Sequence, residues 1–227
     1  MMSWKIHPDE RLQLYSPIGL RLIDEFTGRP PIGRITTELD IKDGTGWRST
    51  SITAGRSMSG VVIFPRLGRR ADAVGAQPEI YRIRISAEFY RPFYALNADG
   101  IEFTAYPYND TNPPTDYTVN PPVVIKPQVQ DEKLLPAVNY PFPTHVRVLR
   151  GKVVDAAGLP IVNAEVRRTA TERTVSGEKG AYALPLRWTA NGLLVPIDAI
   201  DHRSGNTGTI NVMLPDDLGK NKTITIP

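Results

Sequence analysis

Apolar and polar residues alternate along several short stretches of this chain. In one of them, residues 81–89, every second residue is apolar and the residues between are charged or polar. Because successive side chains of a β-strand point to opposite faces, this alternation predicts a strand with one buried face. The apolar positions of the stretch are Tyr81, Ile83, Ile85, Ala87 and Phe89.

The C-terminal part repeats the alternation in four further stretches, which are separated by Gly, Pro, Asn and Asp residues typical of turns. Helical spacing of apolar residues is nearly absent. Several short strands with turns between them indicate a β-sandwich or a barrel. The apolar positions of these stretches are Tyr182, Leu184 and Leu186, then Leu193, Val195, Ile197 and Ala199, then Ile210, Val212 and Leu214, then Ile224 and Ile226.

A proline-rich segment separates the two halves of the chain. Residues 106–143 contain nine prolines and no glycine. Proline fixes φ and donates no backbone hydrogen bond, so we expect a stiff connection rather than central strands, with VVIK at 123–126 as a candidate edge strand. The predicted parts are an N-terminal arm at 1–16, a β-sandwich domain at 17–106, the linker at 107–143 and a second β-sandwich domain at 144–227.

Residues 150–168, RGKVVDAAGLPIVNAEVRR, have the pattern of two strands joined by a tight turn. Asp155 can accept hydrogen bonds from the amides of the turn, and Gly158 supplies a position that tolerates a positive φ. Pro160 begins the returning strand, where no ladder donor is needed. A second hairpin carries Gly180 at its tip. We expect these four residues to serve turn geometry.

In this region the chain resembles the carboxypeptidase regulatory-like domain, a transthyretin-like or prealbumin-like β-sandwich, over residues 147–226. The shared pattern is G-x-V-x-D-x-x-G-x-P followed by G-x-Y-x-L, and Asn163 stands where the family usually has a second glycine. The resemblance implies a spacer, adhesive or structural role and no particular activity. The residues that carry it are Gly151, Val153, Asp155, Gly158, Pro160, Ala164, Val166, Ser176, Gly180, Tyr182 and Leu184.

A weaker echo of the same pattern lies in the first half. Asp24, Gly28 and Pro30 follow one another in the same order, with one extra residue between the Asp and the Gly. We therefore interpret residues 18–105 as a diverged second copy. The predicted fold class is all-β, with two tandem immunoglobulin-like or transthyretin-like β-sandwich domains joined by the stiff linker.

Composition narrows the classes of function. The 227 residues carry a formal net charge of +3 and neither half is strongly basic, so we expect no nucleic-acid partner. No window is long and apolar enough for a membrane span, and the N-terminus lacks the apolar run of a signal peptide. The absence of cysteine excludes disulfides and thiolate sites and favours synthesis in a reducing cytoplasm.

No catalytic constellation is visible in the sequence. His7, His145 and His202 are scattered, and no pair has the spacing of a metal site. Nucleophile-elbow, Walker-type and dinucleotide-binding motifs are absent. We therefore predict no catalytic, cofactor-binding or metal-binding residue, no cofactor and no enzymatic activity.

Two groups of side chains are candidates for contacts with a partner, because Tyr and Arg are enriched at protein interfaces. In the aromatic group, Tyr90 faces outward if Phe89 faces inward, which would also suit a glycan platform. The alternatives are packing of the aromatics beneath the proline-rich linker and a solvated loop for the arginines. The candidate interface residues are Tyr90, Phe93, Tyr94, Arg66, Arg69 and Arg70.

These observations favour a non-enzymatic structural or assembly protein whose partners are other subunits, in a homo- or hetero-oligomer. By analogy of fold and context, we predict a component of a phage tail, a baseplate or a contractile injection particle, made in the cytoplasm and incorporated into the virion or particle. The alternative is a carbohydrate-binding or cell-surface-binding β-sandwich module.

Overall fold

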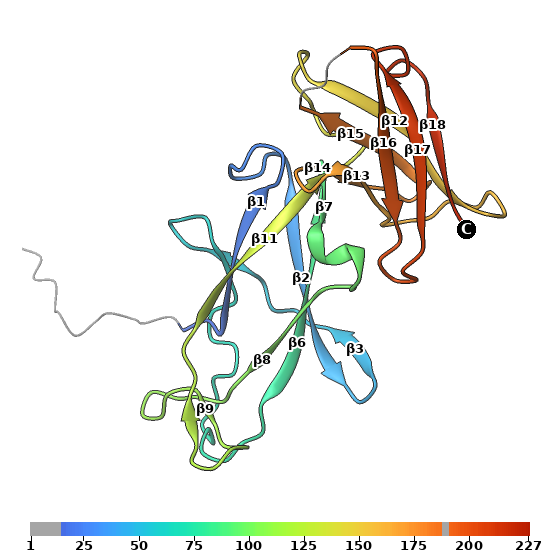
Figure 1. Cartoon of the computed structure of the whole chain (residues 1–227). Helices are drawn as coiled ribbons and strands as arrows, with labels where there is room; N and C mark the ends of the chain where they lie inside the picture. The colour runs from blue at the N-terminus through green and yellow to red at the C-terminus, as the bar shows by residue number, and fades with distance from the viewer. Residues whose placement is uncertain (1–14, 188–190) are drawn as a thin grey trace, which may run out of the picture. The chain divides into compact units, whose positions relative to one another are not determined.

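The computed structural model describes residues 15–187 and 191–227. The predicted arm at 1–16 therefore lies outside the described residues, apart from its last two. Strands account for almost all regular structure in the described part, which confirms the all-β class (Figure 1). The one helix described is a 3-10 turn, η1, at Phe93–Leu96. It is far too short to cross a membrane, and the described residues hold no membrane-spanning helix.

Eleven strands precede residue 137, and seven follow it. The first group forms a five-stranded sheet in the order β4-β5-β1-β11-β7, a four-stranded sheet in the order β3-β2-β6-β8 and a two-stranded sheet of β9 and β10. The strands of this group are β1 Ile18–Asp24, β2 Ile35–Asp43, β3 Gly46–Ser49, β4 Gly55–Arg56, β5 Val62–Ile63, β6 Glu79–Ala87, β7 Tyr90–Pro92, β8 Ile101–Ala105, β9 Thr115–Asp116, β10 Val123–Val124 and β11 Gln128–Pro136.

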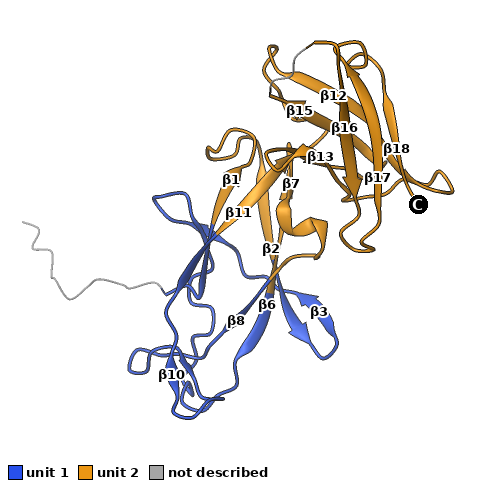
Figure 2. Ribbon diagram, viewed as in Figure 1, with its two compact units in different colours: residues 1–20, 39–81, 102–130 blue, residues 21–38, 82–101, 131–227 orange. Residues whose placement is uncertain are grey.

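The chain divides into two compact units, which Figure 2 shows in two colours. Unit 1 comprises residues 1–20, 39–81 and 102–130, and unit 2 comprises residues 21–38, 82–101 and 131–227. The division falls inside β1, β2, β6, β8 and β11, so these five strands run from one unit into the other. The boundaries predicted from the sequence, and the arrangement as two tandem sandwiches, stay predictions.

The predicted stiff linker at 107–143 is wrong for residues 128–136. These residues form β11, which lies between β1 and β7 in the five-stranded sheet and is therefore a central strand. The physical reason is the position of the prolines: Pro127 precedes the strand and Pro136 is its last residue, so the ladder between them keeps its donors. Val123 and Val124 form β10, which pairs with β9.

The C-terminal part of unit 2 consists of two sheets. One has the order β15-β12-β18 and the other the order β14-β13-β16-β17. Apart from β12 and β18, which run parallel, the strand pairs are antiparallel. We call this pair of sheets the C-terminal sandwich; Figure 1 shows it in yellow to red. Its strands are β12 Arg147–Asp155, β13 Glu165–Thr169, β14 Glu172–Val175, β15 Ala181–Leu186, β16 Leu193–Ile200, β17 Thr207–Leu214 and β18 Lys222–Ile226.

The core of the C-terminal sandwich is formed by the apolar positions of the alternating stretches. Alternate residues of β15, β16, β17 and β18, together with Leu149 and Val153 of β12, enter one buried cluster to which both sheets contribute. Burial of such side chains is the main favourable contribution to folding. The buried members are Leu149, Val153, Ala164, Val166, Tyr182, Leu184, Leu186, Val195, Ile197, Ala199, Val212, Leu214, Ile224 and Ile226. The prediction that Leu193 faces inward is wrong, because this first residue of β16 is 51% exposed.

Two turns in unit 2 share one geometry. At the end of β12, the Asp155 carboxylate accepts hydrogen bonds from the Ala157 and Leu159 amides at 2.9 and 2.8 Å. The glycine of that turn, Gly158, has a φ of 81°. At the end of β1, Asp24 accepts from two amides of its own turn, and Gly28 has a φ of 70°. Only glycine adopts such values at little cost, so both turns depend on the same pair of residue types.

Asp217, in the turn before β18, is bound by three donors. Its carboxylate accepts from the Met213 amide at 2.9 Å and lies 2.8 Å from Lys222 Nζ and 3.1 Å from Lys220 Nζ. The hydrogen bond from Lys222 contributes most, with those from Met213 and Lys220, to hold the pKa of Asp217 well below its ordinary value of 3.8. The ionised carboxylate thereby ties the end of β17 to the start of β18.

We expect Asp217→Asn to lower the melting temperature at neutral pH. A depressed folded-state pKa stabilises the fold above the unfolded pKa of 3.8, and this contribution is lost as the pH falls below that value. The difference in melting temperature between wild type and variant should therefore narrow below pH 3.8, as followed by circular dichroism. A difference that stays constant with pH would contradict the ion-pair explanation.

We expect Gly151→Ala to destabilise the chain by about 2 kcal/mol or more, because overpacking forces the backbone to shift. A Cβ at Gly151 would collide with the Lys222 carbonyl oxygen of β18 and lie 2.7 Å from the Tyr182 hydroxyl. Urea unfolding measures the loss. Gly219→Ala is the matched control, since a Cβ there has nothing within 4 Å. Equal losses in both variants would show that the contact with β18 is not the cause.

Candidate functional site

Tyr90 is buried, so the prediction that it faces outward is wrong. Its exposed fraction is 1%. Its hydroxyl accepts a hydrogen bond from the Ile32 amide and donates to Asp24. Its ring lies edge-on to Tyr140, with centroids 5.4 Å apart. The reason is a bend at residues 88–89, which restarts the alternation between β6 and β7. The alternative given by the sequence, packing of the aromatic side chains beneath the proline-rich segment, is what Tyr90 does, because Tyr140 belongs to that segment.

Phe93 and Tyr94 lie in η1, and each contacts the chain around it. Phe93 is 37% exposed, and the Arg173 guanidinium lies 4.7 Å from the centroid of its ring, a cation–π contact. The Tyr94 hydroxyl lies 2.6 Å from the Ile85 amide, from which it accepts a hydrogen bond. The Tyr94 amide donates to Glu132, a buried carboxylate whose pKa is raised by burial.

The three arginines of the predicted basic group lie in unit 1 and differ in their partners. Arg69 has Nη2 at 2.7 Å from both carboxylate oxygens of Asp110. Arg70 makes two hydrogen bonds to Asp72. Arg66 is exposed and has a φ of 67°, unusual for a residue with a side chain. Their use as an interface stays a prediction.

Within unit 2, edge strand β14 holds the C-terminal sandwich against β11 and η1. We call this contact the β14 junction. The Thr174 hydroxyl donates to the Pro136 carbonyl at 2.6 Å. Beside it, Val175 packs with Leu96 and Leu135 in a small buried apolar cluster. Neighbouring residues of one short strand thus combine polar and apolar contacts.

Charged side chains complete the β14 junction. Arg173 places Nη2 2.7 Å from Glu25 Oε1 and Nη1 3.3 Å from Glu165 Oε1. The Glu165 carboxylate is almost fully buried and also lies 2.8 Å from His202 Nε2. Glu25 receives a second cation, Lys133, at 3.2 Å. Because each carboxylate has at least two polar neighbours, the cost of removing these charges from water is offset.

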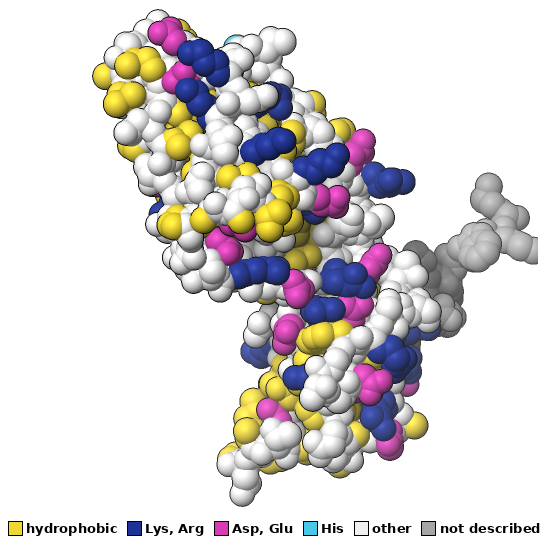
Figure 3. Space-filling model, turned by 90° about the vertical axis from the view of Figure 1, so that its right-hand side faces the viewer, with side chains coloured by type: hydrophobic (Ala, Val, Ile, Leu, Met, Phe, Trp, Pro, Cys, Tyr) yellow, Lys and Arg dark blue, Asp and Glu magenta, His cyan; other side chains and the backbone are white. Residues whose placement is uncertain are grey.

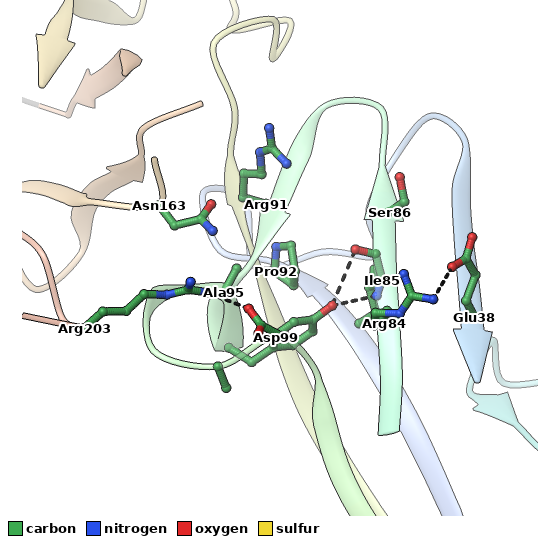
Figure 4. Close-up of a pocket in the computed structure, with 12 residues that line it drawn as sticks. Glu38, Arg84, Ile85, Ser86, Arg91, Pro92, Ala95, Asp99, Asn163 and Arg203 are labelled. Carbon is green, nitrogen blue, oxygen red and sulfur yellow. Dashed lines mark hydrogen bonds and ion pairs between the residues drawn. The ribbon is translucent and has the colours of Figure 1, made fainter. Parts of the chain in front are cut away.

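Next to the β14 junction, unit 2 contains a hollow of about 380 Å³, which we call the charged hollow (Figure 4). Side chains from β2, β6, β7 and η1 line one side, and two residues of the C-terminal sandwich line the other. In Figure 4, Asn163 and Arg203 reach from the sandwich towards Arg91, Pro92 and Asp99. The lining residues are Glu38, Arg84, Ile85, Ser86, Arg91, Pro92, Tyr94, Ala95, Ala98, Asp99, Asn163 and Arg203.

The three guanidinium groups of the charged hollow differ in how tightly they are paired. Arg84 lies 2.8 Å from Glu38, and Arg203 lies 2.8 Å from Asp99. Arg91 lies 3.9 Å from Glu178, which is too far for a hydrogen bond. The Arg91 side chain is 35% exposed. Of the three, Arg91 therefore keeps the most hydrogen-bonding capacity for another group.

Asn163 lines the charged hollow in an unusual backbone conformation. Its φ is 60°, in the left-handed region, at the position where the sequence pattern usually has glycine. Its amide donates to the Ser176 carbonyl at 3.0 Å. Asn163 Oδ1 is the one buried side-chain oxygen in the described residues that lacks a hydrogen-bond partner. Strained, unsatisfied groups of this kind concentrate at functional sites.

Sequence reasoning missed the residues of the junction and of the charged hollow. Arg173 and Glu165 occupy alternating polar positions, which are typical of a solvated strand face. The one available signal was Asn163, which stands where the pattern of the resembled domains usually has glycine. Over the described ranges, no three His, Asp or Glu side chains gather as they would around a metal ion. On the face shown in Figure 3, basic and acidic side chains are interspersed rather than separated by sign.

No protein-family model and no curated protein sequence matches the chain. Among solved structures, it is similar to the TIE protein of Bacillus anthracis, at 10% identity and a TM-score of 0.27, over 94% of this chain and 33% of that protein. A streptococcal ancillary pilin gives 12% identity and a TM-score of 0.26, over 92% and 67%. A C-terminal fragment of the pilus adhesin SpaC from Lactobacillus rhamnosus GG gives 15% and 0.23, over 92% and 86%.

The chain spans about a third of the Bacillus protein's length and about two thirds of the pilin's. Similarity at this level leaves the function to be argued from the chain's own residues. The resemblance to carboxypeptidase regulatory-like domains and the diverged repeat stay predictions.

We expect Arg173→Ala to destabilise the chain by about 3 kcal/mol, because it leaves two carboxylates at the β14 junction without their shared cation. Urea unfolding measures the change. Arg167→Ala is the matched control: Arg167 also faces Glu165, but at 3.6 Å and with 42% of its side chain exposed, so its removal should cost less than about 1 kcal/mol. Similar losses in the two variants would show that Arg173 does not hold the junction.

Proposed function

We propose that this protein is a non-enzymatic structural component that acts through contacts with other protein chains, one of them a second copy of itself. The observation that carries the proposal is an exposed apolar patch on the outer face of the β14-β13-β16-β17 sheet. Leu194 is 58% exposed and Met213 is 37% exposed, and the two are paired directly across β16 and β17. Pro196, also exposed, is the next outward residue on β16.

The apolar patch continues a sheet face that is already covered at its other end. Val195 and Ile197 enter the core, so the residues between and beside them point outward. At the far end of β16, Ile200 pairs with Glu165, which belongs to the β14 junction. From Ile200 to Leu194 the same face passes, over about 20 Å, from a covered to an open surface.

We propose a second copy of the chain as the partner of this patch. The Leu194, Pro196 and Met213 side chains carry no charge, so two copies of this surface can meet without like-charge repulsion. Two copies related by a two-fold axis would bring the same patch together and remove it from water. Burial of exposed leucine and methionine side chains provides the driving force.

Other functions have less support. A glycan platform requires an outward Tyr90, and that ring is buried. In the charged hollow, both lining carboxylates are bound by guanidinium groups, an arrangement that suits binding better than proton transfer. A carboxypeptidase regulatory-like identity for residues 147–226 fits a structural role. Membership of a phage tail, baseplate or injection particle is a further prediction, which rests on analogy alone.

Sedimentation velocity at increasing protein concentration tests the proposal. We expect a species heavier than one chain to appear as the concentration rises. Leu194→Lys should weaken this association at least about tenfold, because it places a charge in the buried patch. Val74→Lys is the matched control, since Val74 is an apolar residue of unit 1 with 63% exposure. A wild type that stays monomeric throughout, or an equal loss in the control, would contradict self-association.

A further inference from the structure

We infer that the charged hollow binds an acidic segment of a partner protein, with the Arg91 guanidinium receiving a carboxylate. This inference rests on the proposed function, because it names the chemistry of one protein partner. It concerns a different surface from the apolar patch. The two contacts can therefore be tested separately.

The pairing of the guanidinium groups points to Arg91 as the receiving group. Arg84 and Arg203 each have a carboxylate at 2.8 Å, whereas the ion pair of Arg91 is 3.9 Å long. Its partner, Glu178, has 87% of its side chain exposed and is easily displaced by another carboxylate. A guanidinium offers five N–H donors in a planar fork that matches a carboxylate.

The charge of the lining favours an anion of limited charge. Three guanidinium groups and two carboxylates line the charged hollow, so the lining keeps one net positive charge once a ligand carboxylate has displaced Glu178 from Arg91. A single carboxylate neutralises that charge. The polyanionic backbone of a nucleic acid would also approach Glu38, Asp99 and Glu178, and those contacts are repulsive. The balance therefore favours an acidic protein segment.

The walls of the charged hollow suit a peptide rather than a small ion. Pro92, Ala95 and Ala98 offer small apolar surfaces, and Asn163 presents a carboxamide on the opposite wall. The position of Asn163 is fixed by the hydrogen bond from its backbone amide to the Ser176 carbonyl and by its left-handed backbone. Fixed groups lose little entropy when a ligand binds. A volume of about 380 Å³ leaves room for a side chain with adjoining backbone.

The test is binding of a fluorescent hexaglutamate peptide to the whole chain, followed by anisotropy, with hexaglutamine as the neutral probe. We expect the acidic probe to bind more tightly than the neutral one. Arg91→Gln should weaken its binding about tenfold, the loss of one charge-assisted hydrogen-bonded contact. Arg21→Gln is the matched control, because Arg21 is an exposed arginine of unit 2 bound to Asp131.

A second variant reverses the sign of the effect. Glu178→Gln removes the carboxylate that competes for Arg91, so it should strengthen binding of hexaglutamate. Because the Glu178 side chain is 87% exposed, we expect this variant to fold as the wild type does. Glu102→Gln, which removes an exposed carboxylate of unit 1, is its control and should change binding less. In wild-type protein, titration with the peptide should shift the Asn163 side-chain amide signal in nuclear magnetic resonance spectra.

Several results would overturn the inference. These are no preference for hexaglutamate over hexaglutamine, equal losses in Arg91→Gln and Arg21→Gln, equal gains in Glu178→Gln and Glu102→Gln, or tighter binding of a single-stranded oligonucleotide than of the acidic peptide. Sedimentation separates the two proposals, and Arg91→Gln should associate as the wild type does because Arg91 lies outside the apolar patch. If wild-type protein associates while hexaglutamate fails to bind it, only the inference on the charged hollow is wrong. If the peptide binds and no association occurs, only the apolar contact is wrong.

Discussion

The bridge from Arg173 to Glu25 and Glu165 is the interaction that fixes β14 against the neighbouring part of unit 2. It brings a cation between two carboxylates that are largely removed from water. Burying either carboxylate without its cation would cost free energy of folding. The three groups therefore hold the C-terminal sandwich in one position against β11 and η1. Thr174 and Val175 follow in the same strand, and their contacts exist because β14 is held there.

The charged hollow forms because β14 is held in this position, which brings residues of the C-terminal sandwich close to β7 and η1. Asn163 and Arg203 come from loops of the C-terminal sandwich, and Arg91 and Asp99 come from β7 and the segment after η1. A shift of β14 by one residue would carry the sandwich residues away from the others. The ion pair of Arg203 with Asp99 closes one end of the hollow and reinforces the same position.

The sequence predicted the inward face of most strands because burial follows the two-residue period of the backbone. Leu184, Ile197 and Val212 lie where the alternation places them. Two features escaped it. A bend at residues 88–89 turned Tyr90 inward, and prolines at the ends of β11 left its interior free to pair. The number of prolines in residues 107–143 led to the prediction of a stiff linker, whereas the positions of those prolines allow β11 to form.

The site escaped prediction for a different reason. Alternation separates the two faces of a strand but does not identify what covers the polar one. Glu165 and Arg173 looked like solvated residues, and the charged hollow collects side chains from positions 38 to 203 without any shared motif. Asn163 differed from the glycine of the resembled pattern, but only the fold shows that it has a left-handed backbone and an unpaired side-chain oxygen beside the charged hollow.

The parallel pairing of β12 with β18 has a consequence for how the sandwich is made. β12 opens the sandwich sequence and β18 closes it, so the edge of β12 stays unpaired during synthesis until every intervening strand has emerged from the ribosome. Non-local pairing of this kind must first overcome the entropy of closing a long loop. The β15-β12-β18 sheet can therefore be completed only after residues 222–226 have been made, although the other pairs of the sandwich do not need them.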